Sequence, residues 1–357
     1  MIKLKRVDER DTIFARANYK KDSAAYKDYY AKNPEKKNID DSFRTRPQLL
    51  EEGTTTYNKL NSPIADSAFA FLNDIKDLCE GEISSKKIDG DSKTFTKKIK
   101  GIASLYGTCM VGITKLQDKH IYTHRGRYEE NYGEEVSLNH KYAIVFGCEM
   151  DLDMINRAPM ISEVIATSKS YVDVAVIGMI ISYYIRNLGY EARNHVDANY
   201  LVMPSLIAED AGLGQIGRNS LLTNKDYGSR FKLGVVTTNL PLDIDEKVDF
   251  GLEDFCKVCK KCALTCPSQS LSRKNKIDKD GKYNWTVNKE SCYTKWRYLG
   301  TDCGMCISVC PFSQKLESIK KCESFKKNGT AIKNALEEYK NKFGSRVFIA
   351  GNPYWLK

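Results

Sequence analysis

Continuous apolar runs of two lengths stand out in the middle of the chain. Residues 110–114 and 142–150 are short runs of consecutive apolar side chains, a pattern typical of strands buried on both faces. Residues 163–188 form a much longer apolar stretch, and Gly189 follows it at a position that suits the left-handed end of a helix. This stretch therefore predicts a long core helix after the second strand.

Shorter patterns complete the same region. Residues 99–105 favour a helix before the first strand, and residues 205–210 favour another after the long helix. Residues 221–223 and 232–238 are rich in side chains that strands prefer. Helices that alternate with strands in this way predict an α/β or α+β core between about residues 95 and 250.

Three regions flank this core. Residues 1–95 are polar and rich in Lys and Tyr, and we expect them to form a solvated, partly helical wrapping around the core. Residues 251–320 contain eight of the 12 cysteines, and residues 321–357 form a short tail. The sequence thus predicts four parts, with the core assigned to residues 96–250.

The composition indicates a folded protein with a basic surface. Of the 357 residues, 41% are hydrophobic, which is ample for a buried core. The net charge is +10, and residues 251–330 alone carry 16 Lys or Arg against 8 Asp or Glu. Two explanations fit this surplus: the cations offset the negative charge of ligated thiolates, or they form a nucleic-acid patch.

The sequence predicts neither a leader nor a membrane span. An acidic run at residues 8–11 stands where a secretory leader would carry its apolar region. The longest apolar run, residues 172–185, is shorter than the roughly 20 residues of a membrane helix. We therefore expect a soluble, cytoplasmic protein, in which clustered cysteines serve metal or redox chemistry more often than disulfides.

Two cysteine motifs share their spacing and their ending. They read Cys256-x2-Cys259-x2-Cys262-x3-Cys266-Pro267 and Cys292-x10-Cys303-x2-Cys306-x3-Cys310-Pro311. This is the arrangement of ferredoxins with two [4Fe–4S] clusters, in which the fourth cysteine of each motif ligates the other cluster.

The crossover divides the eight cysteines into two sets. The first cluster is assigned to Cys256, Cys259, Cys262 and Cys310. The second cluster is assigned to Cys292, Cys303, Cys306 and Cys266. A pair of zinc sites is the alternative, but zinc ribbons do not require the CxxxCP ending twice.

Two further motifs lack the context that their usual function needs. Residues 212–217 fit G-x-G-x-x-G, but the segment before them favours a helix and the segment after them a strand, the reverse of a dinucleotide fingerprint. We interpret them as a glycine turn that lets the backbone approach some cofactor. His120 stands in a segment similar to the D-x-H-x-x-G motif of cobalamin proteins, yet Thr123 replaces its glycine. We therefore expect His120 to lie at the surface. We also expect that no histidine of this chain serves as the lower ligand of the cobalt in a cobalamin.

Long stretches of the sequence resemble the reductive dehalogenases of organohalide-reducing microbes. The resemblance is carried by DFGLEDFCKVCKKCALTCPS (residues 249–268) and CYTKWRYLGTDCGMCISVCPFS (residues 292–313). Further similar stretches are VDERDTIFARA (7–17), AIVFGCEMD (143–151), IRNLGYEAR (185–193), AGLGQIGRNSLLT (211–223) and VVTTNLPL (235–242). Together they extend over nearly the whole chain.

The resemblance implies an α+β fold, with a nitroreductase-like cobalamin-binding core and a ferredoxin-like segment that holds two [4Fe–4S] clusters. Matched by motif, the family's catalytic tyrosine falls on Tyr171, its pocket asparagine on Asn199 and its basic partner on Lys232. Electrons from the clusters would reduce the corrinoid to Co(I), which removes the halide, while Tyr171 donates a proton. Lys232 is expected to lower the pKa of this phenol, with Asn199 orienting the donor or the substrate.

The family also implies cofactor contacts and partners. The residues expected to contact cobalamin are Gly212, Gly214, Arg218, Gly228 and Ser229. The expected partners are a small organohalide substrate and an electron-donor protein such as ferredoxin or flavodoxin, without nucleic acid or a membrane span. Assembly as a homodimer stays open.

Two other functions stay open from the sequence. Epoxyqueuosine reductases, which modify tRNA, share the cobalamin core and both clusters, and the charge of +10 suits tRNA. That family, however, has an Asp as proton donor where Tyr171 stands, and a gap longer than the ten residues between Cys292 and Cys303. The other alternative is an iron–sulfur electron carrier without catalytic activity.

Overall fold

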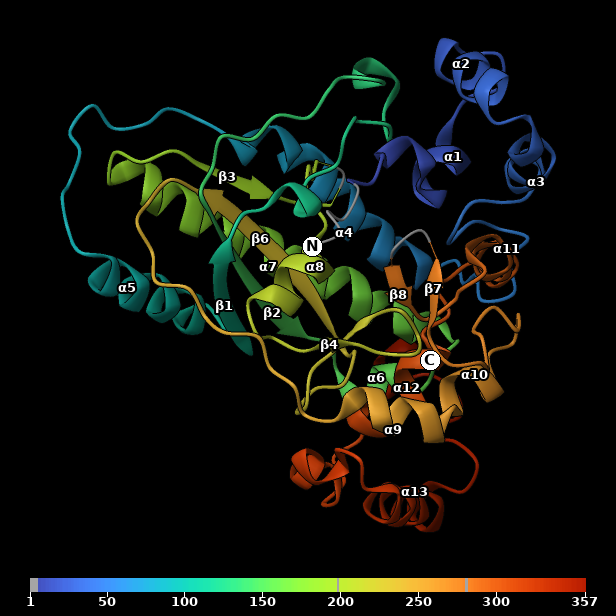
Figure 1. Ribbon diagram of the computed structural model, residues 1–357. Coiled ribbons are helices and arrows are strands. Elements are labelled where there is room, and N and C mark those ends of the chain that lie inside the picture. Colours follow the sequence, from blue (N-terminus) through green and yellow to red (C-terminus); the bar gives the residue numbers. More distant parts are fainter. Residues whose placement is uncertain (1–5, 198, 280–281) are drawn as a thin grey trace.

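A four-stranded antiparallel sheet lies at the centre of the computed structural model, which describes residues 6–197, 199–279 and 282–357. Its strands are β1 (Met110–Lys115), β2 (Tyr142–Glu149), β3 (Ala192–His195) and β6 (Phe231–Thr238). Their order is β1-β2-β6-β3, and every neighbouring pair is antiparallel (Figure 1). The apolar runs predicted β1, β2 and β6, whereas the polar β3 was missed.

Helices cover both faces of this sheet. They are α5 (Ser92–Leu105), α7 (Ile161–Asn187) and α8 (Pro204–Asp210). Ile144 and Phe146 of β2 pack in the hydrophobic cluster formed with α5 and α7, while Ala143 and Val145 pack in the cluster formed with α8. Alternate residues of one strand are therefore buried in opposite layers, as the pleat requires.

α7 is the long apolar helix that the sequence predicts, and Gly189 follows it with a φ of +82°. Among the helices of the described residues it alone is long and apolar enough to cross a membrane, which corrects the expectation that no run reaches that length. Its most apolar window is, however, 61% buried inside the protein. α7 packs on β6 and β3 and along α4 (Ser62–Ile75), so its composition suits a core helix with neighbours on several sides.

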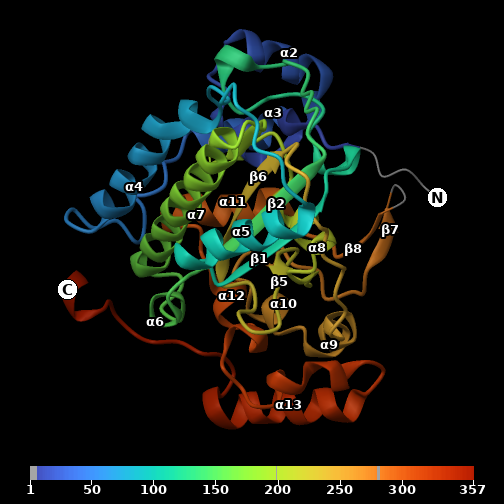
Figure 2. The same ribbon diagram turned by 90° about the vertical axis from the view of Figure 1, so that its left-hand side faces the viewer.

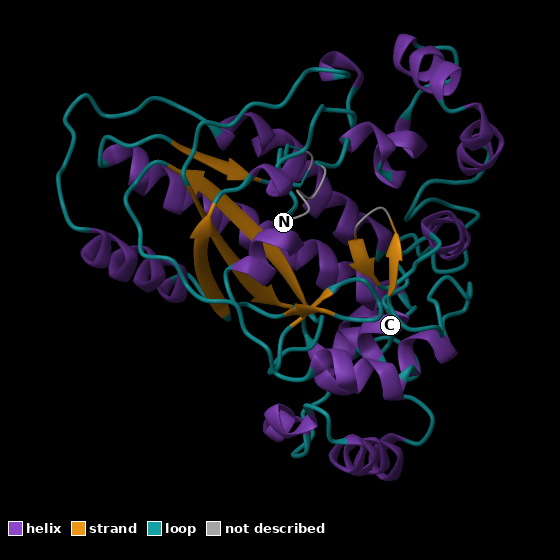
Figure 3. Ribbon diagram, in the orientation of Figure 1, coloured by secondary structure: helices purple, strands orange, loops and turns teal. Residues whose placement is uncertain are grey.

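The cysteine segment folds as short helices and a hairpin at one end of the sheet (Figures 2 and 3). Its elements are α9 (Leu252–Cys259), α10 (Lys261–Thr265), β7 (Ile277–Lys279), β8 (Lys282–Asn284), α11 (Lys289–Leu299) and α12 (Met305–Ser308). α13 (Gly329–Phe343) packs on α9, and one hydrophobic cluster joins Phe255 and Phe312 to Ile332 and Tyr339. The apolar core thus crosses the boundary expected at residue 320.

Short elements complete the fold. They are α6 (Leu152–Ile155), β4 (Gln215–Ile216), β5 (Leu222–Thr223) and the 3-10 helices Glu9–Asp11, Lys76–Cys79, Asp118–His120, Glu129–Asn131, Pro311–Ser313, Ile319–Phe325 and Tyr354–Leu356. β4 and β5 pair on either side of the turn that follows the glycine motif.

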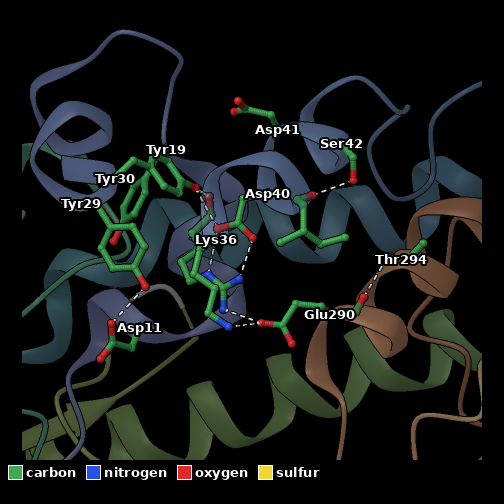
Figure 4. Close-up of polar contacts among 12 residues, drawn as sticks. Asp11, Tyr19, Tyr29, Tyr30, Lys36, Asp40, Asp41, Ser42, Glu290 and Thr294 are labelled. Atoms are coloured by element: carbon green, nitrogen blue, oxygen red, sulfur yellow. Dashed lines mark hydrogen bonds and ion pairs between the residues drawn. The ribbon is translucent and has the colours of Figure 1, made fainter. Parts of the chain in front are cut away.

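The N-terminal region is tied to α11 by buried charges. Its helices are α1 (Ile13–Asn18), α2 (Ala24–Lys32) and α3 (Pro34–Arg44), which surround a cluster of buried tyrosines. Arg16 donates to Asp40 at 2.9 and 2.7 Å and to Glu290 at 3.0 Å. Lys36 donates to the same Glu290 oxygen at 3.0 Å (Figure 4). This network anchors α11, the helix that carries Cys292, to α1 and α3.

Candidate functional site

The first thiol set, Cys256, Cys259, Cys262 and Cys310, lines a single small cavity. α9 carries Cys256 and Cys259, and α10 carries Cys262. Lys260 joins the two helices with a φ of +55°, so the chain turns sharply between them. The last thiol comes from the other motif, about 50 positions away in the sequence, which is the crossover that the spacing predicts.

The second thiol set gathers in the same way around Cys306 on α12. Burial, and then the neighbouring Cys303, Cys292 and Cys266, raise the pKa of Cys306 well above its usual value. These three neighbours are the other members of the predicted second set. Without a metal, each thiolate would repel the others, so the four thiols resist ionisation. The iron of one cluster would stabilise all four thiolates together, so such a group suits a cluster site.

The two thiol sets are neighbours. Burial, and then a group of thiols that includes Cys306 of the second set, raises the pKa of Cys262 in the first set. Within the part of the chain that the structure describes, no three His, Cys, Asp or Glu side chains have the spacing of a single-ion site. The thiols are instead arranged as two adjacent sets of four.

Tyr171 and Lys232 meet between the core helix and the sheet. Tyr171 lies on α7, Lys232 lies on β6, and the Lys232 Nζ is 4.7 Å from the centroid of the tyrosine ring. The same ammonium lies 3.8 Å from an Asp302 carboxylate oxygen. Because Asp302 immediately precedes Cys303, this contact connects the Tyr171–Lys232 pair to the second thiol set.

The pKa of Tyr171 differs from the expectation. Lys232 lowers it, as predicted, but burial and the carboxylates of Asp197 and Asp302 outweigh the ammonium. The pKa is therefore raised above its ordinary value of 10.0, and the phenol keeps its proton. Burial alone would lower the pKa of Lys232, but Tyr171 and Asp302 outweigh it, so Lys232 stays charged.

The side chain of Asn199 is engaged with other residues than the Tyr171–Lys232 pair. Its amide oxygen accepts from Arg193 at 2.7 Å and from Arg125 at 3.3 Å. Its amide nitrogen donates to the Lys76 carbonyl at 2.8 Å. These bonds tie β3 to the end of α4, and a direct role of Asn199 in orienting substrate stays a prediction.

The sequence did not single out two carboxylates at this site. Glu163 of α7 is fully buried, and burial followed by the charge of Asp302 raises the pKa of Glu163 well above 4.5. Glu163 Oε2 and Asp302 Oδ1 are both buried without hydrogen-bond partners among the described residues. Asp302 could have been suspected from its place in the second motif, whereas Glu163 lies in an apolar helix and gives no local signal.

Three of the residues expected to contact cobalamin, Gly212, Gly214 and Ser229, lie against other parts of the chain itself. A side chain at Gly212 or Gly214 would collide with the chain's own backbone, at Glu246 and Thr223 respectively. The close approach that these glycines allow is therefore internal. Ser229 bonds to the Thr223 hydroxyl at 3.0 Å. The contacts of all three residues with a cofactor stay predictions.

Gly228 and Arg218 adjoin the cysteine motifs. A Cβ at Gly228 would collide with Ser313, three residues beyond Cys310. Arg218 lines the cavity of the first thiol set, and its Nε donates to the Cys256 carbonyl at 2.9 Å. The structure thus places Arg218 beside the first thiol set, and the contacts of Arg218 and Gly228 with cobalamin stay predictions.

His120 is buried, which corrects the expected surface position. Its Nε2 lies 2.9 Å from Asp210, which also pairs with Lys119 at 2.5 Å and Lys247 at 2.6 Å. Burial alone would raise the pKa of Asp210, but the hydrogen bonds from His120, Lys119 and Lys247 outweigh burial and lower the pKa below 3.8.

Asp210→Asn is expected to destabilise the protein by about 2 kcal/mol, because it leaves Lys119 and Lys247 without their common anion. A lowered carboxyl pKa contributes stability that is present above the ordinary value of 3.8 and lost as the pH falls below it. Urea unfolding at several pH values would measure both effects. Glu317→Gln, which removes an exposed ion pair with Lys320, is the control and should change stability by less than about 0.5 kcal/mol.

A cavity of about 800 Å³ adjoins α7 on a different face from the one that carries Tyr171. It is lined by residues of α4, α7, the end of β2 and the C-terminal segment, among them Lys169, Asp173, Lys315 and Trp355. Tyr171 lies on a different face of the helix from Lys169 and Asp173, and it does not line this cavity.

Comparisons with known proteins agree with this arrangement. Residues 255–314 match the family model of the 4Fe-4S dicluster domain. The tetrachloroethene reductive dehalogenase of Desulfitobacterium hafniense is 32% identical over 203 residues, 53% of this chain and 36% of that protein. An epoxyqueuosine reductase of Cyclobacterium marinum is 33% identical over 153 residues, 41% of this chain and 48% of that protein. The solved structure of the catabolic reductive dehalogenase NpRdhA superposes with a TM-score of 0.77 at 24% identity, covering 96% of this chain and 47% of that one.

The fold and the two thiol sets define an α+β protein with a 4Fe-4S dicluster segment. The chain is similar in sequence to reductive dehalogenases over about half of its length, and its fold superposes on that of solved reductive dehalogenases. The chain spans about a third of the length of the curated dehalogenases it matches, and about half of the length of NpRdhA.

Proposed function

We propose that the chain is a cobalamin-dependent reductive dehalogenase in which Tyr171 delivers a proton to the carbon that loses its halide. The observation that carries this proposal is the position of Lys232, 4.7 Å from the centre of the Tyr171 ring. The same Lys232 pairs with Asp302, next to the second thiol set. A proton donor and an electron route therefore lie within one short chain of contacts.

The surroundings of Tyr171 suit a proton donor. Burial and the nearby carboxylates keep the phenol protonated until it is needed. When the proton leaves, the Lys232 ammonium stabilises the phenolate that forms, in a site where little water screens the charge. Asn199 acts by holding the strand that precedes Asp197 against α4, since its amide is bonded to Arg193 and Lys76.

Cobalamin, when bound, supplies the reduced cobalt that breaks the carbon–halogen bond, and two [4Fe–4S] clusters supply the electrons. The residues around Gly228 fit a corrinoid, whose amide side chains both donate and accept. Arg230 Nη2 and Ser313 Oγ are buried there without partners among the described residues. Gly212 and Gly214 leave no such room, because their neighbours are the chain's own backbone.

The substrate class follows from the relatives. Curated relatives are named for tetrachloroethene, and the NpRdhA structure that covers 99% of this chain was solved with 3-bromo-4-hydroxybenzoic acid. Both compounds carry halogen on an sp² carbon. We propose a small organohalide of this kind as the substrate, and tRNA modification as the alternative that the epoxyqueuosine reductase match keeps in view.

Halide release tests the proposal. Protein reconstituted with iron, sulfide and cobalamin, then reduced, is expected to release bromide or chloride from a haloalkene or a halophenol. The same preparation without cobalamin should release none. Release of halide at equal rates with and without cobalamin would contradict the proposal, as would conversion of an epoxyqueuosine-modified stem loop in place of any organohalide.

Electrons are proposed to enter at the first thiol set, because Asp302, which immediately precedes Cys303 of the second set, contacts Lys232. Residues 256–276 hold six Lys or Arg and no Asp or Glu. Val258 and Leu264, which flank the cysteines, are 44% and 57% exposed. An apolar centre with a basic rim suits an acidic carrier of the ferredoxin or flavodoxin class.

Reduction of the clusters by a reduced acidic ferredoxin is expected to slow about tenfold between low and physiological ionic strength, because salt screens electrostatic steering. Lys260→Glu should slow the reaction at low salt, whereas Lys333→Glu on α13 should not. Stopped-flow bleaching of the cluster absorbance measures both rates. Equal slowing by the two variants would mean that net charge, rather than this face, governs docking.

A further inference from the structure

Arg218 is a buried cation whose hydrogen bonds leave one end of the guanidinium free. Its side chain is 1% exposed. Nε donates to the Cys256 carbonyl at 2.9 Å, and Nη1 donates to the carbonyls of Ser272 and Lys274 at 2.8 and 2.6 Å. A guanidinium has five N–H donors, so these bonds use three and leave the two on Nη2. Nη2 is buried and has no partner among the described residues.

The guanidinium of Arg218 lies beside the first thiol set. Arg218 lines the same cavity as Cys256, Cys259, Cys262 and Cys310. The guanidinium carbon lies 4.2 Å from the centroid of the Trp285 ring, which holds the planar group against the hairpin β7–β8. Its position is therefore fixed from three sides: by α9, by the loop at residues 272–274 and by Trp285.

A purely structural role accounts for only part of this arrangement. Clamping α9 to the loop at residues 272–274 requires Nε and Nη1, but it does not require Nη2. A buried donor without a partner costs about 1–3 kcal/mol. The thiolates and sulfides of a cluster are acceptors of the kind that a charged donor prefers, and they would occupy the cavity that Arg218 lines.

We propose that Arg218 Nη2 donates to the first [4Fe–4S] cluster and raises its reduction potential. This inference rests on the iron–sulfur part of the proposed function and is independent of the dehalogenation itself. A four-thiolate cluster is anionic, and one-electron reduction adds a further negative charge. A fixed cation in a site of low dielectric stabilises the reduced state more than the oxidised one. Hydrogen bonds to the sulfurs act in the same direction.

The consequence concerns the route of electrons. The first cluster lies on the side that we propose for electron entry, and the second lies near Lys232 and Tyr171. A potential raised by Arg218 makes the first cluster easier to reduce by an external carrier. Arg218 is thus a positioning and tuning residue, which acts on the cluster and does not touch the substrate.

Redox titration followed by EPR tests this inference on the reconstituted holoprotein. Arg218→Gln is expected to lower the one-electron reduction constant of the first cluster at least tenfold, a shift of about 59 mV to lower potential. The second cluster serves as an internal control and should keep its potential. Arg273→Gln removes an exposed cation from the same loop and should leave both potentials unchanged.

Arg218→Lys separates the effect of the positive charge from the effect of the hydrogen bonds that hold α9 to the loop at residues 272–274. Lysine keeps a cation and a donor but loses the planar fork, so most of the wild-type potential should return. An unchanged first-cluster potential in Arg218→Gln with full iron content would overturn the inference, as would an equal drop in Arg218→Lys.

If Arg218→Gln does not assemble the cluster, pulsed EPR of wild-type protein labelled with [15N]arginine tests the inference instead. An arginine nitrogen coupled to the first cluster is expected, and its absence would overturn the inference. A protein with two clusters but no corrinoid would instead contradict only the proposed function.

Discussion

Tyr171→Phe is expected to lower the rate of halide release per bound cobalamin by 10²–10⁴-fold, the usual contribution of general acid catalysis. The substitution removes one oxygen and keeps the ring that packs beside Phe69 and under the Lys232 ammonium. Iron and cobalt contents should therefore stay at their wild-type values. The measurement is halide released per minute, divided by cobalt content.

Lys232→Ala provides the matched test of the mechanism. It should also slow halide release, because without the ammonium the phenolate that forms is less stable. The two losses should not add in the double variant, since both substitutions disable the same donor. Near-wild-type turnover per cobalt in Tyr171→Phe, accompanied by lower thermal stability, would mean that Tyr171 is a core residue only.

Cys310→Ala is expected to abolish the first cluster and leave the second, although Cys310 belongs to the second motif. The reason is that its thiol lines one cavity with Cys256, Cys259 and Cys262. Iron should fall by about four atoms per chain, half of the full content of two clusters. Cys266→Ala should cause an equal loss of iron from the other cluster.

EPR of the remaining cluster identifies which one was lost. The reduced spectrum of Cys310→Ala should match that of Cys256→Ala, and the spectrum of Cys266→Ala should match that of Cys306→Ala. Cys148→Ala, which alters a lone buried cysteine of β2, is the control and should retain all the iron. If Cys310→Ala instead matches Cys306→Ala, each motif holds its own cluster and the crossover is wrong.

The elements with strong local signals were predictable from the sequence. The apolar runs predicted β1, β2, β6 and α7, because burial of these segments requires apolar side chains along their length. β3 was missed because its residues are Ala192 followed by Arg193, Asn194 and His195. Its polar side chains are buried with partners: Asn194 bonds to Ala175 of α7, and His195 bonds to Thr237 of β6. A strand of this kind is stabilised by contacts with residues that are distant in the sequence, so the local sequence alone does not predict it.

Among the predicted site residues, too, those fixed by local spacing were predictable, whereas those that depend on distant parts of the chain were not. The thiol sets follow from spacing, because short loops hold each group of ligands. The surroundings of His120 and Arg218 depend on residues far away in the chain: Asp210 is 90 positions from His120, and Cys256 is 38 positions from Arg218. No local pattern could predict those contacts, so His120 was wrongly expected at the surface and the bond from Arg218 to Cys256 was not foreseen.

The metal content of the reconstituted protein tests the central claim most directly. Protein reconstituted anaerobically with iron, sulfide and cobalamin, and then freed of unbound cofactor, should contain about eight iron atoms and one cobalt atom per chain. Its visible spectrum should show both a corrinoid and iron–sulfur absorbance. Eight iron atoms without cobalt would contradict the proposed function as a cobalamin-dependent dehalogenase and would leave the electron carrier. Stoichiometric zinc without iron would contradict the proposed clusters as well.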